Sequence, residues 1–199
     1  GADKSENSYG SYDYWIVKLD SLGNITWENT IGGNNADYLN DILEIPGGGY
    51  IAVGGSASNA SGEKSSNTFG TFGYNDYWVV KLDAGGNLIW EKIFGGDSGD
   101  FGTCISLMHD GNILIGGNSS SQISGNKTST TYAFTIDIWI VKIDTNGNIL
   151  WENAIGGDDF DYVMEMPLAN DGGVVLGGFS YSGLSGDKTE ANNGIADFA

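Results

Sequence analysis

A phrase of 21 residues occurs three times in this chain, and this repetition constrains the fold more than any other feature. The copies read DYWIVKLDSLGNITWENTIGG at 13–33, DYWVVKLDAGGNLIWEKIFGG at 76–96 and DIWIVKIDTNGNILWENAIGG at 137–157. Their tryptophans recur at intervals of 63 and 61 residues. A repeat of this kind is a supersecondary unit that buries its apolar face only against its neighbours. We therefore expect a row of similar units.

Each repeat contains four short segments with the apolar alternation typical of strands. In the most complete copy they are 37–45, 49–56, 76–83 and 87–94. The third and fourth are joined by DSLGN, DAGGN or DTNGN, in which Gly and Asn supply the positive φ that tight hairpins need. Glycine occupies 33 of 199 positions and proline only 2, which favours many turns between short strands. The sequence predicts an all-β fold of about three β-propeller-type repeats, each a four-stranded antiparallel blade.

The third strand of each repeat carries apolar residues on both faces. In the first copy, Trp15 and Val17 point to one face and Tyr14 and Ile16 to the other. A strand of this type belongs to a sheet covered on both sides by other sheets. Neighbouring propeller blades would provide that cover.

The hairpin between the third and fourth strands leads to two further expectations. Lys18 is expected to face Thr26, which brings Glu28 to the diagonal position. The equivalent pairs are Lys81 with Glu91 and Lys142 with Glu152. The hairpin tryptophans are expected to fill the seams between blades in nearly equivalent ways: Trp27, Trp90 and Trp151.

The repeat divides the chain into four parts. Residues 1–36 contain a loop remnant and the second half of a blade, 37–99 and 100–160 are whole repeats, and 161–199 are the first half of a blade with the start of its third strand. Two half-blades leave unpaired edges, which invite pairing with another strand. We expect either an excerpt of a longer array or a protomer that pairs with another copy, while closure with three blades remains open.

The charge of the chain excludes some partners. The formal net charge is −18, all eight basic residues are Lys, and there is no Arg. Such a surface repels nucleic acid and anionic membranes. No stretch approaches the length of a membrane span, so we expect no membrane insertion. Cys104 lies in an apolar strand and His109 at a turn, where an inert thiol and a solvated imidazole are expected.

The acidic loop before each first strand is the candidate metal site. In the second and third repeats it contains Asp97, Asp100, Asp158 and Asp161, whereas the first has Asn34 and Asn35 in place of carboxylates. Closely spaced hard oxygen ligands are those that Ca²⁺ prefers, although the spacing is not that of an EF-hand. The alternative, which we favour, is that Asp37, Asp100 and Asp161 accept backbone N–H bonds and tie adjacent blades together.

The long loop between the second and third strands is the candidate recognition site. It varies most among the repeats, and all copies are expected to emerge on one face, where loops on a rigid scaffold carry specificity. Exposed aromatics there would stack on sugars or partner proteins: Phe69, Phe72, Tyr74, Tyr132, Phe134 and Tyr181. The alternative is that these rings pack under their own loops.

Catalysis is not expected from these residues. The prominent carboxylates recur in two or three repeats, whereas an active site normally breaks a repeat, and no catalytic motif such as GxSxG or HExxH occurs.

The Gly-Gly after the second strand and the Trp in the fourth resemble the kelch repeat. The pattern DYWVVKLD–GN–W–GG followed by Asp171-Gly172-Gly173 and Ser185-Gly186-Asp187-Lys188 resembles tandem repeats of large secreted proteins of Bacteroidota. This resemblance implies a β-propeller segment of a secreted or surface protein, often exported by the type IX route. We therefore expect a non-enzymatic segment that binds protein or glycan in adhesion or assembly. The alternative is a carbohydrate-binding or carbohydrate-processing propeller whose active site lies outside this segment.

Overall fold

The protein is built from strands and loops. The computed structural model describes residues 4–70, 73–194 and 196–198, and within them no helix is long and apolar enough to span a bilayer. The strands are β1 (Tyr14–Leu19), β2 (Ile25–Ile31), β3 (Asp37–Glu44), β4 (Tyr50–Ser56), β5 (Asp76–Leu82), β6 (Leu88–Phe94), β7 (Asp100–Leu107), β8 (Ile113–Ser119), β9 (Asp137–Ile143), β10 (Ile149–Ile155), β11 (Asp161–Glu165), β12 (Gly177–Ser180) and β13 (Asp197–Phe198). The prediction of an all-β chain is confirmed.

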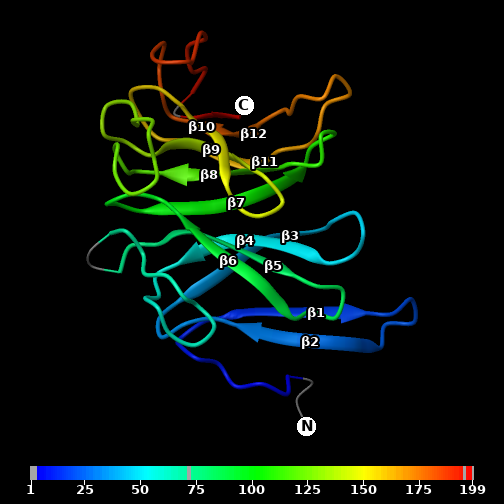
Figure 1. The fold of residues 1–199 in the computed structure, drawn as a ribbon. Helices are drawn as coiled ribbons and strands as arrows, with labels where there is room; N and C mark the ends of the chain where they lie inside the picture. Colours follow the sequence, from blue (N-terminus) through cyan, green and yellow to red (C-terminus); the bar gives the residue numbers. More distant parts are fainter. Residues whose placement is uncertain (1–3, 71–72, 195, 199) are drawn as a thin grey trace.

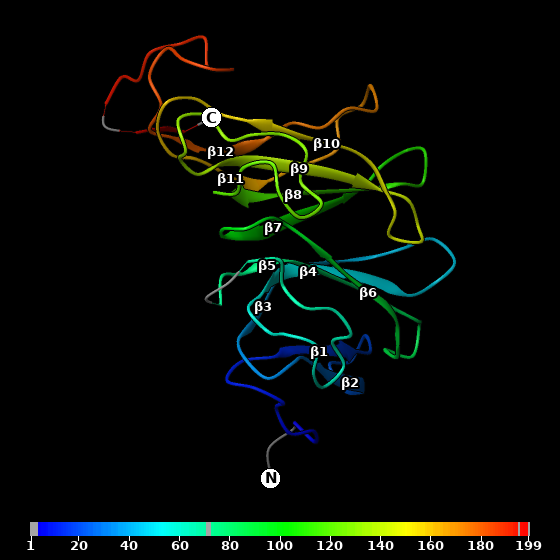
Figure 2. The same ribbon diagram turned by 60° about the vertical axis from the view of Figure 1, so that its left-hand side comes forward.

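The strands form four antiparallel sheets that lie one above the other (Figures 1 and 2). The two middle sheets are four-stranded meanders, in the orders β3-β4-β5-β6 and β7-β8-β9-β10. They are flanked by the two-stranded sheet β1-β2 and by the three-stranded sheet β11-β12-β13. The predicted repetition of four-stranded antiparallel sheets is therefore present. β11 ends before Pro167, because proline cannot donate the next ladder hydrogen bond.

The hydrophobic core lies between the sheets. Tyr77 and Val79 of β5 point into the cluster shared with β7–β9, whereas Trp78 and Val80 point into the cluster shared with β1 and β2. All four side chains have no exposed surface. A third, smaller cluster around Cys104 joins β7–β9 to β11. The apolar residues on both faces of the third strand thus predicted its burial correctly. The Cys104 thiol is also buried, as expected.

The first sheet differs from the middle ones on its outer face. Tyr14 and Ile16 are buried against β5, but Trp15 is 44% exposed and Leu19 is 53% exposed. Within the described residues β1 pairs with β2 alone, whereas the equivalent β5 and β9 are paired along both edges.

Tyrosines of the third strand hold adjacent sheets together. The hydroxyl of Tyr14 donates to the carbonyl of Trp78 at 3.0 Å, and that of Tyr77 donates to the carbonyl of Trp139 at 2.9 Å. Each ring also packs on the indole of the residue that it binds, with centroids 4.8 and 4.9 Å apart. A buried Tyr hydroxyl needs such a partner, and the carbonyl of the next repeat supplies it.

The predicted Lys–Glu pairs of the hairpin are wrong. A register shift between Lys18 and Leu19 places Lys18 opposite Trp27, because Thr26 is the extra residue of a bulge. Glu28 therefore lies toward Trp15 and accepts its indole N–H at 2.6 Å. The same Trp–Glu bond recurs from Trp78 to Glu91 at 2.8 Å and from Trp139 to Glu152 at 2.5 Å.

The hairpin tryptophans are not equivalent. Trp27 donates to the carbonyl of Ala84 at 3.1 Å, and its ring packs against Gly86 in the turn of the next repeat. Trp90 also lies beside the turn glycine of the next repeat, Gly147, but its buried indole N–H has no hydrogen-bond partner. Trp151 is 46% exposed, because no following hairpin covers it in the described part of the chain. The seam-filling role therefore applies to two of the three.

Candidate functional site on the loop face

Two kinds of connection emerge at the same end of the sheets. Because the strands are antiparallel, the short connections 32–36 and 95–99 and the long loops 57–75 and 120–136 share this end. We call it the loop face, and the opposite end, with the tight hairpin turns, the turn face. In Figure 1 the long loops gather on the left.

In three of the four sheets the aspartate that begins the first strand fastens the connection before it. Oδ2 of Asp100 accepts the N–H of Gly96 at 2.8 Å and the hydroxyl of Ser121 at 2.7 Å. Asp37 and Asp161 make the same pair of bonds, and all three side chains are buried. The expectation that these aspartates accept backbone N–H bonds is confirmed. The bonds fix the path of the chain from one sheet to the next.

A second aspartate, at the start of the third strand, lies close to the first. Asp76 accepts the N–H of Phe69 at 2.6 Å and faces Asp100 across Gly95. Burial, with a smaller contribution from the nearby Asp100, raises the pKa of Asp76 to about 8. Burial likewise raises the pKa of Asp137 to about 6. Oδ1 of Asp76 and Oδ1 of Asp100 are both buried without a hydrogen-bond partner. A proton held between the two carboxyl groups would satisfy both oxygens.

A buried lysine completes this polar layer. Lys64 is 2% exposed and Lys127 is 1% exposed, so both belong to the floor of the loop face. The ammonium of Lys127 donates to the carbonyl of Ser129 at 2.7 Å and lies 5.5 Å above the Trp139 ring. Its charge is balanced by nearby carboxylates, of which Glu152 contributes most. Buried charges are retained only when they are paired and hydrogen-bonded.

The predicted metal ligands are split between this floor and the surface. Asp100 and Asp161 are buried, whereas Asp97 and Asp158 are exposed and accept the hydroxyls of Ser124 at 3.0 Å and Ser185 at 2.6 Å. In the described residues, no three carboxylate, His or Cys side chains lie close enough together to hold a metal ion. The Ca²⁺ prediction thus stays a prediction, and backbone carbonyls would have to complete any such site.

The predicted loop aromatics fall into two groups. Phe69 is 45% exposed, but its ring lies over Gly125 in the loop of the next repeat. Tyr132 lies beside Asp187 in the loop of the next repeat. These two rings have a packing role as well as an exposed surface. Phe72 lies outside the described residues.

The other predicted aromatics face solvent. Tyr74 is 49% exposed, Tyr181 is 38% exposed and Phe134 is 84% exposed. Phe134 also has a positive φ of 59°, which is unusual for a bulky residue. This backbone conformation presents the Phe134 ring at the tip of its loop.

A row of aromatic rings crosses the loop face, and the sequence analysis missed it. Tyr12 stacks on Tyr38 with centroids 5.5 Å apart, and Tyr38 lies 6.0 Å from Phe101. Farther along, Tyr162 stacks on Phe179 at 4.8 Å. The available signal was the Tyr or Phe that follows the first aspartate in every repeat. Its function could not be assigned without knowing that these positions are adjacent in space.

The row is interrupted between Phe101 and Tyr162 by a cavity of about 370 Å³. Tyr74, Asn118 and Ser120 also line this cavity. The interruption has a cause in the sequence: Gly55, Asn118 and Phe179 occupy the same position opposite the row in the three repeats. The ring of Phe101 lies over Gly55, where even a Cβ atom would overlap it. Asn118 carries a side chain there, so Tyr162 cannot lie in the same way.

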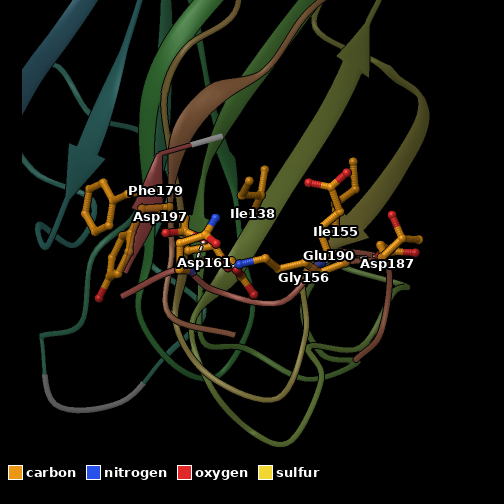
Figure 3. A pocket seen from close by; sticks show the side chains of 13 residues that line it. Ile138, Ile155, Gly156, Asp161, Phe179, Asp187, Glu190 and Asp197 are labelled. Carbon is orange, nitrogen blue, oxygen red and sulfur yellow. Dashed lines mark hydrogen bonds between the residues drawn. The ribbon is translucent and has the colours of Figure 1, made fainter. Parts of the chain in front are cut away.

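A larger cavity, of about 550 Å³, lies beside β11–β13 (Figure 3). Ile138 and Ile155 form one wall, and Asp161, Asp187 and Glu190 line it (Figure 3). At the preceding junction the residues equivalent to Ile138 and Ile155 are Tyr77 and Phe94, and there Trp139 of β9 packs on them. The cavity therefore corresponds in position to the space that the Trp139 indole fills at the preceding junction.

Comparisons with known proteins add one distant similarity. No known protein-family model matches the chain. A regulatory protein, FlaEY, of Caulobacter vibrioides is 26% identical over an alignment of 183 positions that covers 84% of this chain. The match covers 18% of that protein, so the chain spans less than a fifth of its length.

Proposed function

We propose that this chain is a non-enzymatic segment of a secreted or cell-surface repeat protein whose loop face binds a partner in adhesion or assembly. The observation that carries the proposal is the row of aromatic rings on the loop face, with Phe134 at 84% exposure on a neighbouring loop tip. Aromatic rings give large contact area at low entropic cost and dominate binding surfaces. The resemblance to secreted repeat proteins supports the location.

The floor of the loop face supports a binding role rather than catalysis. Its carboxylates recur from repeat to repeat and accept hydrogen bonds from the loops above them. They hold the loops in place, which is what a recognition surface on a scaffold requires. The aromatic and loop residues above them differ among the repeats and would provide the specificity.

The open edge of β1 supports a larger assembly of β-propeller type. The third strands of the middle sheets, β5 and β9, pair on both edges, whereas no strand in the described part of the chain pairs with the second edge of β1. Beside β1 lies an apolar cavity of about 470 Å³, lined by Trp15, Leu19 and Ile42 among others. We propose that first and second strands of a further repeat occupy this place. Sedimentation of the chain alone should then reveal association, and a monomer with β1 amides protected from exchange would contradict this proposal.

The binding role is tested with two matched variants. The first replaces Tyr12, Tyr74 and Phe134 on the loop face by Ser; the second replaces Leu22, Ile89 and Leu150 on the turn face, which are also exposed, by Ser. Both are compared with the unchanged chain on a glycan array and in attachment of protein-coated beads to cells. We expect the loop-face variant to lose binding and the turn-face variant to keep it. Equal binding by both, or no binding by the unchanged chain, would contradict the proposal.

A further inference from the structure

We propose that the cavity between Phe101 and Tyr162 is a subsite for one neutral pyranose ring of a saccharide. This inference rests on the proposed binding function of the loop face and names the ligand class. A pyranose has apolar C–H faces and a rim of hydroxyl groups. It therefore fits a site with aromatic walls and polar groups between them.

The walls of the cavity have the required shape. Phe101 and Tyr162 stand on either side of the break in the aromatic row, and Tyr74 adds a third ring. The volume of about 370 Å³ is at the lower end of the range of about 300–1,000 Å³ for small-molecule sites. A single sugar ring is a ligand of this size. In an oligosaccharide, the sugar units on either side of this ring would lie over the rest of the aromatic row, on Tyr38 toward one end and on Phe179 toward the other.

The polar groups of the cavity match hydroxyl groups. Asn118 accepts the N–H of Val163 through Oδ1 at 3.1 Å, which orients its amide and leaves its Nδ2 as a donor. Asn75 has a buried Oδ1 without a hydrogen-bond partner. A buried acceptor of this kind is costly unless a partner completes it. A sugar hydroxyl both donates and accepts hydrogen bonds, so it can donate to Asn75 Oδ1 and accept from Asn118 Nδ2.

The charges near the cavity select for a neutral sugar. Asp100 is the charged residue that lines it, and no Lys does among the described residues. The chain as a whole carries −18. A uronic or sialic acid would bring its carboxylate toward this negative field. We therefore infer a neutral hexose or deoxyhexose unit.

The site is particular to this junction. At the junction of the two middle sheets Phe101 covers Gly55 and leaves no equivalent space, and in the last sheet Phe179 occupies the position of Asn118. Asn118→Phe introduces the residue that the last sheet has at this position, and its ring should fill the cavity. Tyr162→Ala removes a wall instead. Trp151→Ala is the matched control, because Trp151 is 46% exposed on the turn face and lies outside the cavity.

The test uses the ¹⁵N-labelled chain titrated with methyl glucoside, methyl galactoside and methyl mannoside, and with glucuronate as the charged counterpart. We expect at least one neutral glycoside to shift the amide signals of Phe101, Asn118 and Tyr162, and glucuronate to bind at least tenfold more weakly. Asn118→Phe and Tyr162→Ala should each weaken binding at least tenfold, and Trp151→Ala less than twofold. Thermal melting confirms that each variant is folded. If one of the two cavity variants does not fold, the other alone is enough to test the subsite.

Three outcomes would overturn the inference: no shift at these amides with any neutral glycoside, shifts that both cavity variants retain, or stronger binding of glucuronate. None of these outcomes decides whether the loop face binds a partner, because the proposed function has its own test. The serine variants on the array and the beads report binding through the loop face as a whole. If the loop-face variant loses array binding while the Asn118→Phe chain keeps it, the function stands and this subsite is wrong.

Discussion

The two ends of the sheets use aspartate in opposite ways. On the turn face, Asp20, Asp83 and Asp144 begin the hairpin turns, and hydrogen bonds from the Asn four residues later lower their pKa values. On the loop face, burial raises the pKa values of Asp76 and Asp137. The same repeat thus has exposed, ionised carboxylates at one end and buried, partly protonated ones at the other.

This difference indicates what each end does. A turn capped by an exposed carboxylate stabilises its own hairpin and needs no neighbour. The buried layer of the loop face, by contrast, joins residues of different sheets and holds the long loops over them. We therefore expect substitutions at the loop face to depend on charge and pH, and those at the turn face to depend on packing alone.

The largest expected effect is the removal of a buried lysine. Lys127→Met keeps the length of the side chain but leaves Glu152 and Asp100 without their cation. Lys127 forms no direct salt bridge among the described residues, but leaving nearby carboxylates without a compensating buried charge costs up to about 3–5 kcal/mol. We expect a loss of this size in urea unfolding. Lys92→Met is the control, because Lys92 is exposed, and it should change stability by less than about 0.5 kcal/mol. Equal losses of stability in Lys127→Met and Lys92→Met would mean that the buried charge of Lys127 does not stabilise the fold.

The second effect compares two tryptophans of the turn face. Trp90 packs beside Gly147 and against the core between the middle sheets, so Trp90→Ala should cost about 3 kcal/mol as a cavity substitution. Trp151 is 46% exposed, and Trp151→Ala should cost about 1 kcal/mol or less. Both losses are measured by urea unfolding and should be independent of pH between 6 and 9. An unchanged Trp90→Ala chain would show that the seams contribute little.

The third effect is a loss of stability as the pH rises. Asp76 has a folded pKa of about 8, above its ordinary value, so the folded state holds a proton that the unfolded state has released. Its contribution is complete below about pH 4 and is lost as the pH rises toward 8. One proton contributes about 1.4 kcal/mol per pH unit, so we expect a loss of about 2 kcal/mol between pH 6 and 8.

The charges that face Asp76 define the control for this effect. Asp100 opposes its ionisation, and Lys64 favours it. Asp76→Asn removes the proton and should flatten the dependence on pH between 6 and 8. Asp83→Asn, on the turn face, should leave the dependence unchanged. A chain whose melting temperature is constant from pH 5 to 8 would refute the shared proton.

The strands could be predicted from the sequence because their signals are local. The segment 37–45 was expected, and β3 spans Asp37–Glu44. The burial of both faces of β5 also follows from the apolar run itself, Tyr77 to Val80. His109 is exposed at its turn, as expected. These features need only the period of a strand and the residues of a turn.

Two features could not be predicted, because each depends on the register between strands. The bulge at Thr26 adds one residue and turns Glu28 away from Lys18, and no residue type marks it in the sequence. The strand pairing makes three residues equivalent: Gly55, Asn118 and Phe179. In the first repeat this position is the second glycine of the Gly-Gly doublet, whereas in the other two repeats it is the residue after the doublet. The doublets in the sequence therefore do not indicate this equivalence. The cavity at Asn118 therefore became visible only with the sheets in place.

The smallest expected effect concerns Ca²⁺ at the exposed carboxylates of the loop face. Asp97 and Asp158 lie beside glycine doublets and already accept hydroxyl hydrogen bonds from Ser124 and Ser185. Only weak sites are expected, and at a Ca²⁺ concentration equal to Kd the folded state gains about 0.4 kcal/mol. For a chain of this size that is a rise of about 1 °C in Tm.

Selectivity separates such sites from diffuse screening of the acidic surface. Mg²⁺ should do less than Ca²⁺, because it requires tighter octahedral geometry. Asp97→Asn with Asp158→Asn should abolish the difference between the two ions, whereas Asp20→Asn with Asp144→Asn on the turn face should not. Equal shifts from both ions in every variant would mean that the loop face has no Ca²⁺ site. The exposed aspartates beside the glycine doublets would then serve only to hold the serines of the next long loop.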